Sequence, residues 1–347
     1  MKPPSRNYAN KHEPLPSQRP DNTAFTQQRI PAWQPLLSAS IILPFFFFIG
    51  LSFIGIGIGL NYSSNSIKES EHDYTGALDG EECFHCTSAN VSSPCICNIT
   101  FNITEDFQGT VFMYYELSNF YQNHYRYMIS RDEKQLNGDL YSLKNPANEC
   151  APYRVDSEQN PIAPCGAIAR SMFNDVVTLY RNENGTYVNV PLDGKGISWW
   201  TDYNVKFRNP TNGNESLKTI FQGTVQPAGW RTDAYNLSTD LNNTGFINED
   251  FIVWMRSAAL PTFRKLYRRI ENGSFKNGEY QLRIEYNYPV VSFQGRKKIV
   301  FSSVSWMGGK NPFLGIAYLV FGSLCTVFAI IMLVVFIKYQ GTMDDDI

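Results

Sequence analysis

Two apolar stretches decide the fold: residues 36–60 read LLSASIILPFFFFIGLSFIGIGIGL, and residues 313–337 read FLGIAYLVFGSLCTVFAIIMLVVFI. Neither stretch contains a charged residue. A helix rises about 1.5 Å per residue, so each stretch is long enough to cross the roughly 30 Å of hydrocarbon in a bilayer. A buried helix of a soluble protein rarely runs so far without a charge. We therefore predict two transmembrane α-helices.

These two stretches divide the chain into five segments. The first is too long for a cleaved signal peptide, and residues 1–35, with prolines and acids, precede it, which favours an uncleaved anchor. Residues 61–312 are enough to form a core of their own. We predict a cytosolic N-terminal segment (1–35), a span (36–60), a large domain (61–312), a second span (313–337) and a cytosolic acidic tail (338–347).

Glycosylation signals indicate on which side the large domain lies. The sequence contains nine Asn-X-Ser/Thr sites in which X is not proline, and all nine fall between the two spans. We therefore predict that this domain faces the lumen or the exterior and that both termini are cytosolic. Asn61 abuts the membrane, so we expect it to stay unmodified. The predicted acceptors are Asn90, Asn98, Asn102, Asn184, Asn214, Asn236, Asn242 and Asn272.

Six of the seven cysteines also lie between the spans, and an even number suits an oxidising lumen. The spacing C-x2-C-x8-C-x-C that begins at Cys83 would also permit redox chemistry or a zinc site. Its Gly/Ser/Asn-rich surroundings favour structural disulfides instead. Four cysteines allow three pairings, and nested pairs avoid closing a two-residue loop. We favour the pairs Cys83–Cys97 and Cys86–Cys95, with Cys150–Cys165 as a third bridge.

Strand patterns dominate the large domain. Residues 280–290 alternate between apolar and polar side chains, and residues 297–306 follow after a turn, which predicts a hairpin. Residues 107–116 and 219–226 also read as strands, and they share the pentapeptide FQGTV. We predict a β-rich, antiparallel, sandwich-like domain with a few helices, bearing disulfides and glycans.

One longer helix is predicted over residues 249–270. Asn248 is a suitable N-cap and is followed by acidic residues, whereas basic residues gather near the end, where the helix dipole favours cations. Pro261 should kink or split this helix. The basic residues are Arg264, Lys265, Arg268 and Arg269.

Composition and motifs give no sign of catalysis or nucleic-acid binding. The 347 residues carry a net charge of -2, and 18% of them are charged, so there is no basic excess for nucleic acid. There is no Walker A or G-x-S-x-G sequence and there are only four histidines. We predict no catalytic, cofactor-binding or metal-binding residue and no cofactor.

The first span and the segment before it contain features typical of helix contacts. Gly55 and Gly59 form a G-x-x-x-G sequence, which allows close approach of helices in lipid, either to the second span or to a larger membrane protein. Residues 23–30 could form a short amphipathic helix that turns Phe25 toward lipid or a partner. Trp33 is placed as an interfacial anchor.

Several long segments resemble the Cdc-fifty family, the accessory β-subunits of phospholipid flippases, which are type-four P-type ATPases. These segments cover the chain from about residue 19 to the second span. Details such as NECAPY and NNTGFIN resemble the vertebrate B branch of that family. The segments are RPDNTAFTQQRIPAWQP (19–35), YYELSNFYQNHYRY (114–127), PIAPCGAIARSMFND (161–175), GISWWTDYNVKFRNP (196–210), GFINEDFIVWMRSAALPTFRKLYRRI (245–270) and SWMGGKNPFLGIAY (305–318).

The resemblance implies a non-catalytic subunit that binds the pump one to one. It implies roles in assembly, exit from the endoplasmic reticulum and pump activity, while the pump moves aminophospholipids to the cytosolic leaflet. It implies an integral membrane protein of the endoplasmic reticulum, Golgi and plasma membrane, and a disulfide pattern that these six cysteines fit. The segment before the first span would contact the pump, and the spans would pack near its last helix. The candidate contacts are Phe25, Arg29, Trp33, Gly55 and Gly59.

Two other functions compete with this interpretation. One is a cell-surface adhesion or receptor glycoprotein, which would act without a pump. The other is a luminal redox enzyme that uses Cys83 and Cys86. Stable oxidation of all six cysteines in the large domain would remove the redox alternative.

Overall fold

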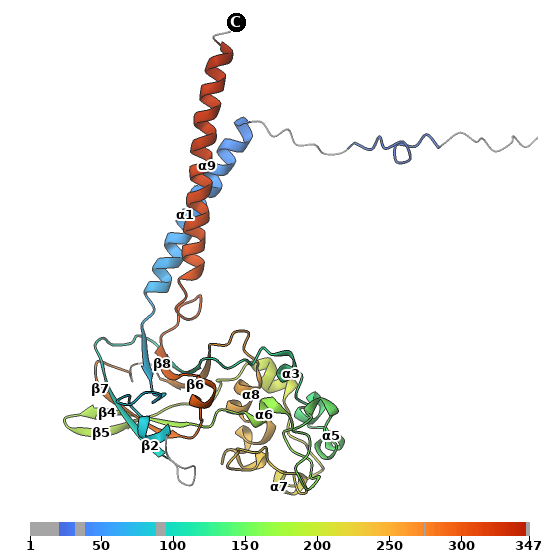
Figure 1. The fold of residues 1–347 in the computed structure, drawn as a ribbon, viewed down its shortest axis with the longest axis vertical. Coiled ribbons are helices and arrows are strands. Elements are labelled where there is room, and N and C mark those ends of the chain that lie inside the picture. Colours follow the sequence, from blue (N-terminus) through green and yellow to red (C-terminus); the bar gives the residue numbers. More distant parts are fainter. Residues whose placement is uncertain (1–20, 32–38, 88–94, 272, 274, 345–347) are drawn as a thin grey trace, which may run out of the picture. The chain divides into compact units, whose positions relative to one another are not determined.

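The computed structural model describes residues 21–31, 39–87, 95–271, 273 and 275–344 (Figure 1). These residues form two compact units, and each is described by itself. One unit holds the apolar helices up to Ile54 and from Val320 onward, and the other is Gly55–Leu319. The second unit contains all of the strands among the described residues. We call these strands and the short helices beside them the central domain (residues 66–312).

The two apolar stretches are helices, α1 (Ala39–Asn65) and α9 (Phe313–Asp344). Both contain a segment that is long and apolar enough to cross a membrane, Ile41–Asn65 and Phe313–Tyr339. Only 17% of the most apolar segment of α1 and 11% of that of α9 are buried, so these helices are not the buried core helices of a soluble domain. Helix α1 continues beyond the predicted end at residue 60, because helical hydrogen bonds do not require apolar side chains.

Two antiparallel four-stranded sheets make up the central domain, and the predicted sandwich-like fold is confirmed. The first sheet has the order β1-β8-β3-β6 and the second has the order β2-β7-β4-β5. The strands are β1 (Glu69–Asp73), β2 (Cys95–Ile103), β3 (Val111–Leu117), β4 (Val176–Glu183), β5 (Thr186–Val190), β6 (Phe263–Ile270), β7 (Gly278–Tyr286) and β8 (Lys297–Ser302).

Aromatic side chains from both sheets form the core between them. Phe101 of β2 stacks on Phe301 of β8 with ring centroids 5.7 Å apart, and Phe275 lies 4.9 Å from Phe301. Alternate residues of β2 are buried, which is the two-residue period of a strand with one face in a core. Each buried aromatic ring contributes on the order of 2 kcal/mol through removal of apolar surface from water.

Short helices lie beside the strands within the central domain (Figure 1). Several begin with a side-chain cap; for example, the Asp132 carboxylate accepts hydrogen bonds from the backbone N–H groups of Lys134 and Gln135. The helices are α2 (Phe84–Thr87), α3 (Tyr125–Met128), α4 (Glu133–Leu136), α5 (Leu140–Lys144), α6 (Ala167–Arg170), α7 (Leu217–Ile220) and α8 (Glu249–Met255).

The predicted hairpin of residues 280–306 is wrong. Strands β7 and β8 exist, but β7 pairs with β2 and β4, whereas β8 pairs with β1 and β3 in the other sheet. The connection between them contains a 3-10 turn, Val291–Phe293, and is long enough to cross from one sheet to the other. Alternation identifies a strand but does not identify its partner.

The single helix predicted over residues 249–270 is also wrong. Helix α8 ends at Met255, and residues 263–270 form strand β6, an edge of the first sheet. The predicted cap is confirmed, because the Asn248 side chain accepts a hydrogen bond from the Phe251 N–H at 3.0 Å. Along β6, buried residues largely alternate with more exposed ones, as in a strand with one face in a core. Packing of that face outweighs the weak local preference for a helix.

Three smaller predictions differ from the structure. Strand β3 begins at Val111, so residues 107–110 are not part of it. Residues 219–226 form the end of α7 and a turn, so the two FQGTV segments have different structures. Residues 24–28 form a turn in place of the predicted amphipathic helix. The Arg29 N–H donates a hydrogen bond to the Ala24 carbonyl oxygen at 2.7 Å and closes this turn.

Candidate functional site: the glycine faces of the apolar helices

Four glycines bring α1 and α9 into close contact. A Cβ placed at Gly57 would lie 2.8 Å from the Leu319 side chain and 3.0 Å from the Gly315 carbonyl oxygen. A Cβ at Gly50 would lie 3.1 Å from the carbonyl oxygen of Gly322. Only glycine therefore allows the two backbones to approach this closely. We call Gly50, Gly57, Gly315 and Gly322 the glycine interface.

The four residues of the glycine interface are regularly spaced along the two helices. Gly50 and Gly57 lie seven residues apart, as do Gly315 and Gly322. A seven-residue repeat keeps one stripe of each helix against the other, as in left-handed coiled coils. Leu43 and Ala329 extend the repeat by one step and are also buried. This repeat is the sequence signal that could have identified the interface.

Gly55 and Gly59 lie on the other side of α1. Each is two residues from Gly57, and at 3.6 residues per turn that places it roughly 200° around the helix. Among the residues that the structure describes, nothing lies within 4 Å of a Cβ placed at either glycine. The G-x-x-x-G sequence therefore does not serve the contact between α1 and α9, and we call Gly55 and Gly59 the open glycine face.

Of the candidate partner contacts before the first span, the structure describes Phe25 and Arg29. Phe25 is exposed, with 79% of its surface accessible. The Arg29 guanidinium donates to the side-chain and main-chain oxygens of Asn22 and so fixes the turn. Trp33 lies outside the described residues. Phe25 and Arg29 belong to the first compact unit and Gly55 and Gly59 to the second, so these candidates are described separately.

The cysteines of the central domain form the nested pairs favoured above. Cys83 is bonded to Cys97 and Cys86 to Cys95. A C-x-x-C redox site needs its two cysteines to pair with each other, which these do not. His85, Cys86 and Cys95 have ligand atoms within 4.8 Å of one another, but both sulfurs are held in a disulfide and cannot bind metal as thiolates. The third bridge is Cys150–Cys165.

Most predicted glycan acceptors are exposed. Asn98 and Asn102 alternate with buried residues on β2 and therefore point away from the core. Asn90 and Asn272 lie outside the described residues. The exposed acceptors are Asn98, Asn102, Asn184, Asn214, Asn236 and Asn242.

Intramolecular contacts occupy the basic cluster of residues 264–269. Arg264 bonds to Glu116 at 2.7 Å, to Glu71 at 2.5 Å and to Glu69, which joins β6 to β3 and β1. Arg268 bonds to Asp250 of α8 at 2.5 Å, and Arg269 bonds to Asp193 at 2.8 Å. A register shift in the pairing of β3 with β6 lies next to Arg268. The cluster therefore stabilises the sheet and its connection to α8.

Lys265 is the buried member of that cluster. Its Nζ donates to the carbonyl oxygens of Val253 at 2.9 Å and Trp254 at 3.1 Å, and also to that of Arg256, where α8 ends. At the end of a helix these carbonyl oxygens have no N–H group of a following turn to accept from, so the Lys265 ammonium supplies the donors. Burial, and to a smaller extent the charge of Arg256, lowers the pKa of Lys265 to about 7.

We expect the free energy of unfolding of the central domain to rise with pH between about 7 and 10 because of Lys265. In this range the unfolded lysine, with its usual pKa of 10.5, keeps a proton that the folded lysine has released, so rising pH favours the folded state. Lys265→Met should flatten this rise. Denaturant unfolding followed by tryptophan fluorescence at several pH values measures it.

The exposed Lys218 provides the control, and Lys218→Met should keep the wild-type slope. The slope should be reduced and not abolished, because burial also lowers the pKa of Lys297, to about 8. A wild-type slope in Lys265→Met would show that the folded lysine keeps its proton and would contradict the assigned cause.

Comparison with known proteins gives the family. A family model described as LEM3 (ligand-effect modulator 3) family / CDC50 family matches residues 60–342. The chain belongs to the CDC50 family. It is 60% identical to human Cell cycle control protein 50B over 338 residues, which are 94% of this chain and 96% of that protein.

Other CDC50-family relatives cover most of the chain as well. Bovine Cell cycle control protein 50A is 56% identical, over 94% of this chain and 91% of that protein. An Arabidopsis thaliana protein named ALA-interacting subunit 3 is 36% identical, over 95% of this chain and 89% of that protein. With its two apolar helices, this CDC50-family chain is an integral membrane protein.

Proposed function

We propose that this protein is the non-catalytic accessory subunit of a type-four P-type ATPase phospholipid flippase. The observation that carries the proposal is the family match over residues 60–342. One relative is named as an interacting subunit, which supports a role in binding a larger protein. The sequence also lacks the Asp-Lys-Thr-Gly phosphorylation sequence of P-type pumps, so in this proposal ATP hydrolysis belongs to the partner.

The subunit acts by differential binding in this proposal. A protein that binds some pump conformations more tightly than others changes their populations without contacting ATP. It assembles one to one with the pump and allows the complex to leave the endoplasmic reticulum for the Golgi and plasma membrane. It supports the movement of aminophospholipids from the exoplasmic to the cytosolic leaflet. Both termini are cytosolic, and the central domain, with its glycans, is luminal or extracellular.

The open glycine face supports a helix-to-helix contact with the pump. Gly55 and Gly59 leave α1 smooth on the side that α9 does not use, and a partner helix can approach closely there. Phe25, Arg29 and Trp33 are the proposed contacts before the span. Phe25 is a large apolar side chain exposed to solvent, so it is available for a partner to cover.

We expect Gly55→Leu/Gly59→Leu to reduce pump recovery at least about tenfold, which corresponds to about 1.4 kcal/mol of lost binding. Two leucines on this face would hold a partner helix away. Affinity purification of the full chain in mild detergent, with mass spectrometry of the co-purifying proteins, measures the recovery. Ile58→Leu on the same helix is the matched control and should bind as the wild type does.

Two results would count against different parts of the proposal. Unchanged pump recovery in the double variant would overturn the helix contact alone. A wild-type protein that recovers no P-type ATPase, and whose exit from the endoplasmic reticulum is independent of pump depletion, would overturn the function and favour the receptor alternative. Trp33→Ala tests the segment before the span in the same purification and should weaken assembly.

A further inference from the structure

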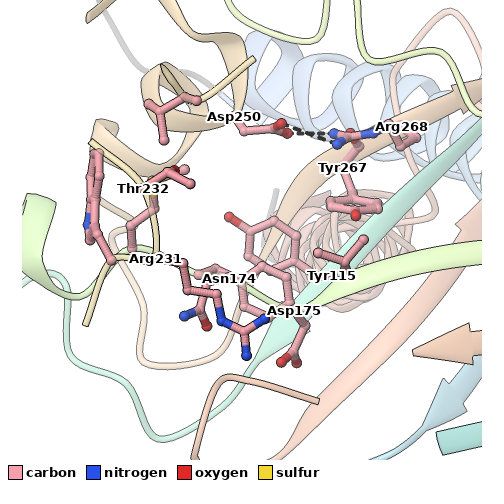
Figure 2. Close-up of a pocket in the computed structure, with 13 residues that line it drawn as sticks. Tyr115, Asn174, Asp175, Arg231, Thr232, Asp250, Tyr267 and Arg268 are labelled. Carbon is pink, nitrogen blue, oxygen red and sulfur yellow. Dashed lines mark hydrogen bonds and ion pairs between the residues drawn. The ribbon is translucent and has the colours of Figure 1, made fainter. Parts of the chain in front are cut away.

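The central domain contains a cavity of about 280 Å³ between the segment before β4, strand β6 and the loop around Trp230. Aromatic rings form much of its wall, including Tyr115, Phe173, Trp230 and Tyr267. Figure 2 shows the Tyr115 and Tyr267 rings between two polar groups, with Asp250 and Arg268 on one side and Asn174 and Arg231 on the other. The cavity therefore combines apolar surfaces with polar edges.

The polar groups of the wall differ in what they can still bind. Asp250 is bonded to Arg268 at 2.5 Å, and the Asp175 carboxylate accepts from Lys297 at 2.6 Å. In contrast, the Asn174 side-chain oxygen is buried without a hydrogen-bond partner among the described residues. The Arg231 guanidinium donates to Asn287, which leaves further donors on the same group. The wall of the cavity thus contains one enclosed, unsatisfied acceptor and free donors beside aromatic rings.

This combination fits a sugar better than an ion or an apolar molecule. A sugar ring has an apolar face that can pack on aromatic rings, and its hydroxyl groups both donate and accept hydrogen bonds. An apolar ligand would leave the Asn174 oxygen unsatisfied, at a cost of about 1–3 kcal/mol. An anion would meet the Asp250 carboxylate in the same wall. The volume is near the lower limit of about 300 Å³ for ligand sites, which suits one or two sugar rings.

The chain carries a sugar acceptor at the edge of this cavity. Asn236 begins the sequence Asn-Leu-Ser, and the next residue, Leu237, lines the cavity. Asn236 itself is exposed, whereas Ala234 is buried. The Asn236 N–H donates a hydrogen bond to the Asp233 carbonyl oxygen at 2.9 Å, which holds the backbone in place. The acceptor is therefore fixed beside the cavity with its side chain accessible.

We propose that the first sugars of an N-linked glycan on Asn236 bind in this cavity. The sugar ring packs on the aromatic wall, a sugar hydroxyl donates to the Asn174 oxygen, and Arg231 donates to a sugar oxygen. The bound glycan covers apolar surface of the central domain and has a fixed direction, unlike a glycan that extends freely into solvent.

Protection from an endoglycosidase tests this binding. We expect the native full-length glycoprotein to lose its Asn236 glycan at least about tenfold more slowly than its Asn184 glycan, which corresponds to a bound fraction of about nine-tenths. Asn184 is the internal control, because it is exposed in the turn between β4 and β5. Glycopeptide mass spectrometry at successive times gives occupancy and rate at each site.

A cavity variant separates sugar binding from local crowding. Asn174→Ala removes the free acceptor and should bring the Asn236 rate to within about twofold of the Asn184 rate. Asn137→Ala, at an exposed asparagine outside the cavity, should leave both rates unchanged. An unmodified Asn236, equal rates in the wild type, or continued protection in a folded Asn174→Ala variant would each overturn the proposal. The wild-type comparison stands even where that variant does not fold.

Discussion

Replacing Gly57 with leucine should destabilise the pairing of α1 with α9 by on the order of 1–3 kcal/mol, the usual cost of forcing extra atoms into a packed contact. The first added carbon would lie 2.9 Å from the Leu319 backbone nitrogen and 3.0 Å from the Gly315 carbonyl oxygen. Backbone atoms cannot rotate aside as a side chain can, so the helices must move apart. Thermal unfolding of the full chain in mild detergent measures the loss.

Gly55→Leu is the matched control for this experiment. It adds the same side chain to the same helix two residues away, where nothing among the described residues lies within 4 Å of the new Cβ. It should leave the unfolding temperature near that of the wild type, while reducing pump recovery in the purification described above. Equal destabilisation by the two variants would contradict the assignment of Gly57 to the internal contact and Gly55 to the open face.

Replacing Lys297 with methionine should lower the free energy of unfolding of the central domain by about 3–5 kcal/mol, the usual cost of breaking a buried ion pair. The Lys297 Nζ lies 2.6 Å from the Asp175 carboxylate, and both side chains are fully buried. It also donates to the Tyr288 carbonyl at 2.7 Å and lies 3.2 Å from the centre of the Tyr286 ring. Removal of the ammonium leaves the Asp175 charge buried without its cation.

The adjacent Arg296 provides the control. Arg296 forms ion pairs with Asp73 and Glu81, but half of its side chain is exposed, so water screens these pairs. Arg296→Met should therefore cost only about 0–1 kcal/mol. Denaturant unfolding of the full chain compares the two variants. A loss of less than about 1 kcal/mol in Lys297→Met would show that the pair does not stabilise the fold.

Local patterns in the sequence determined much of the fold. The charge-free stretches identify both apolar helices, because a long run without a charge is costly except in lipid. Alternation identifies the strand at 278–286, because a strand with one buried face repeats every two residues. The spacing of the cysteines restricts the disulfides because short loops are difficult to close. The resemblance to the family followed from long segments of sequence.

Only the tertiary structure decided which segments pair and which faces meet. The sequence does not assign β7 and β8 to different sheets, because register and partner depend on residues distant along the chain. It suggests a helix at 263–270, where packing against β3 favours a strand. It contains glycines on two sides of α1, and only contact with α9 shows that Gly57 serves the internal interface while Gly55 and Gly59 lie on the open face. Local preferences are worth less than about 1 kcal/mol per residue, so the burial of large side chains between sheets decides such cases.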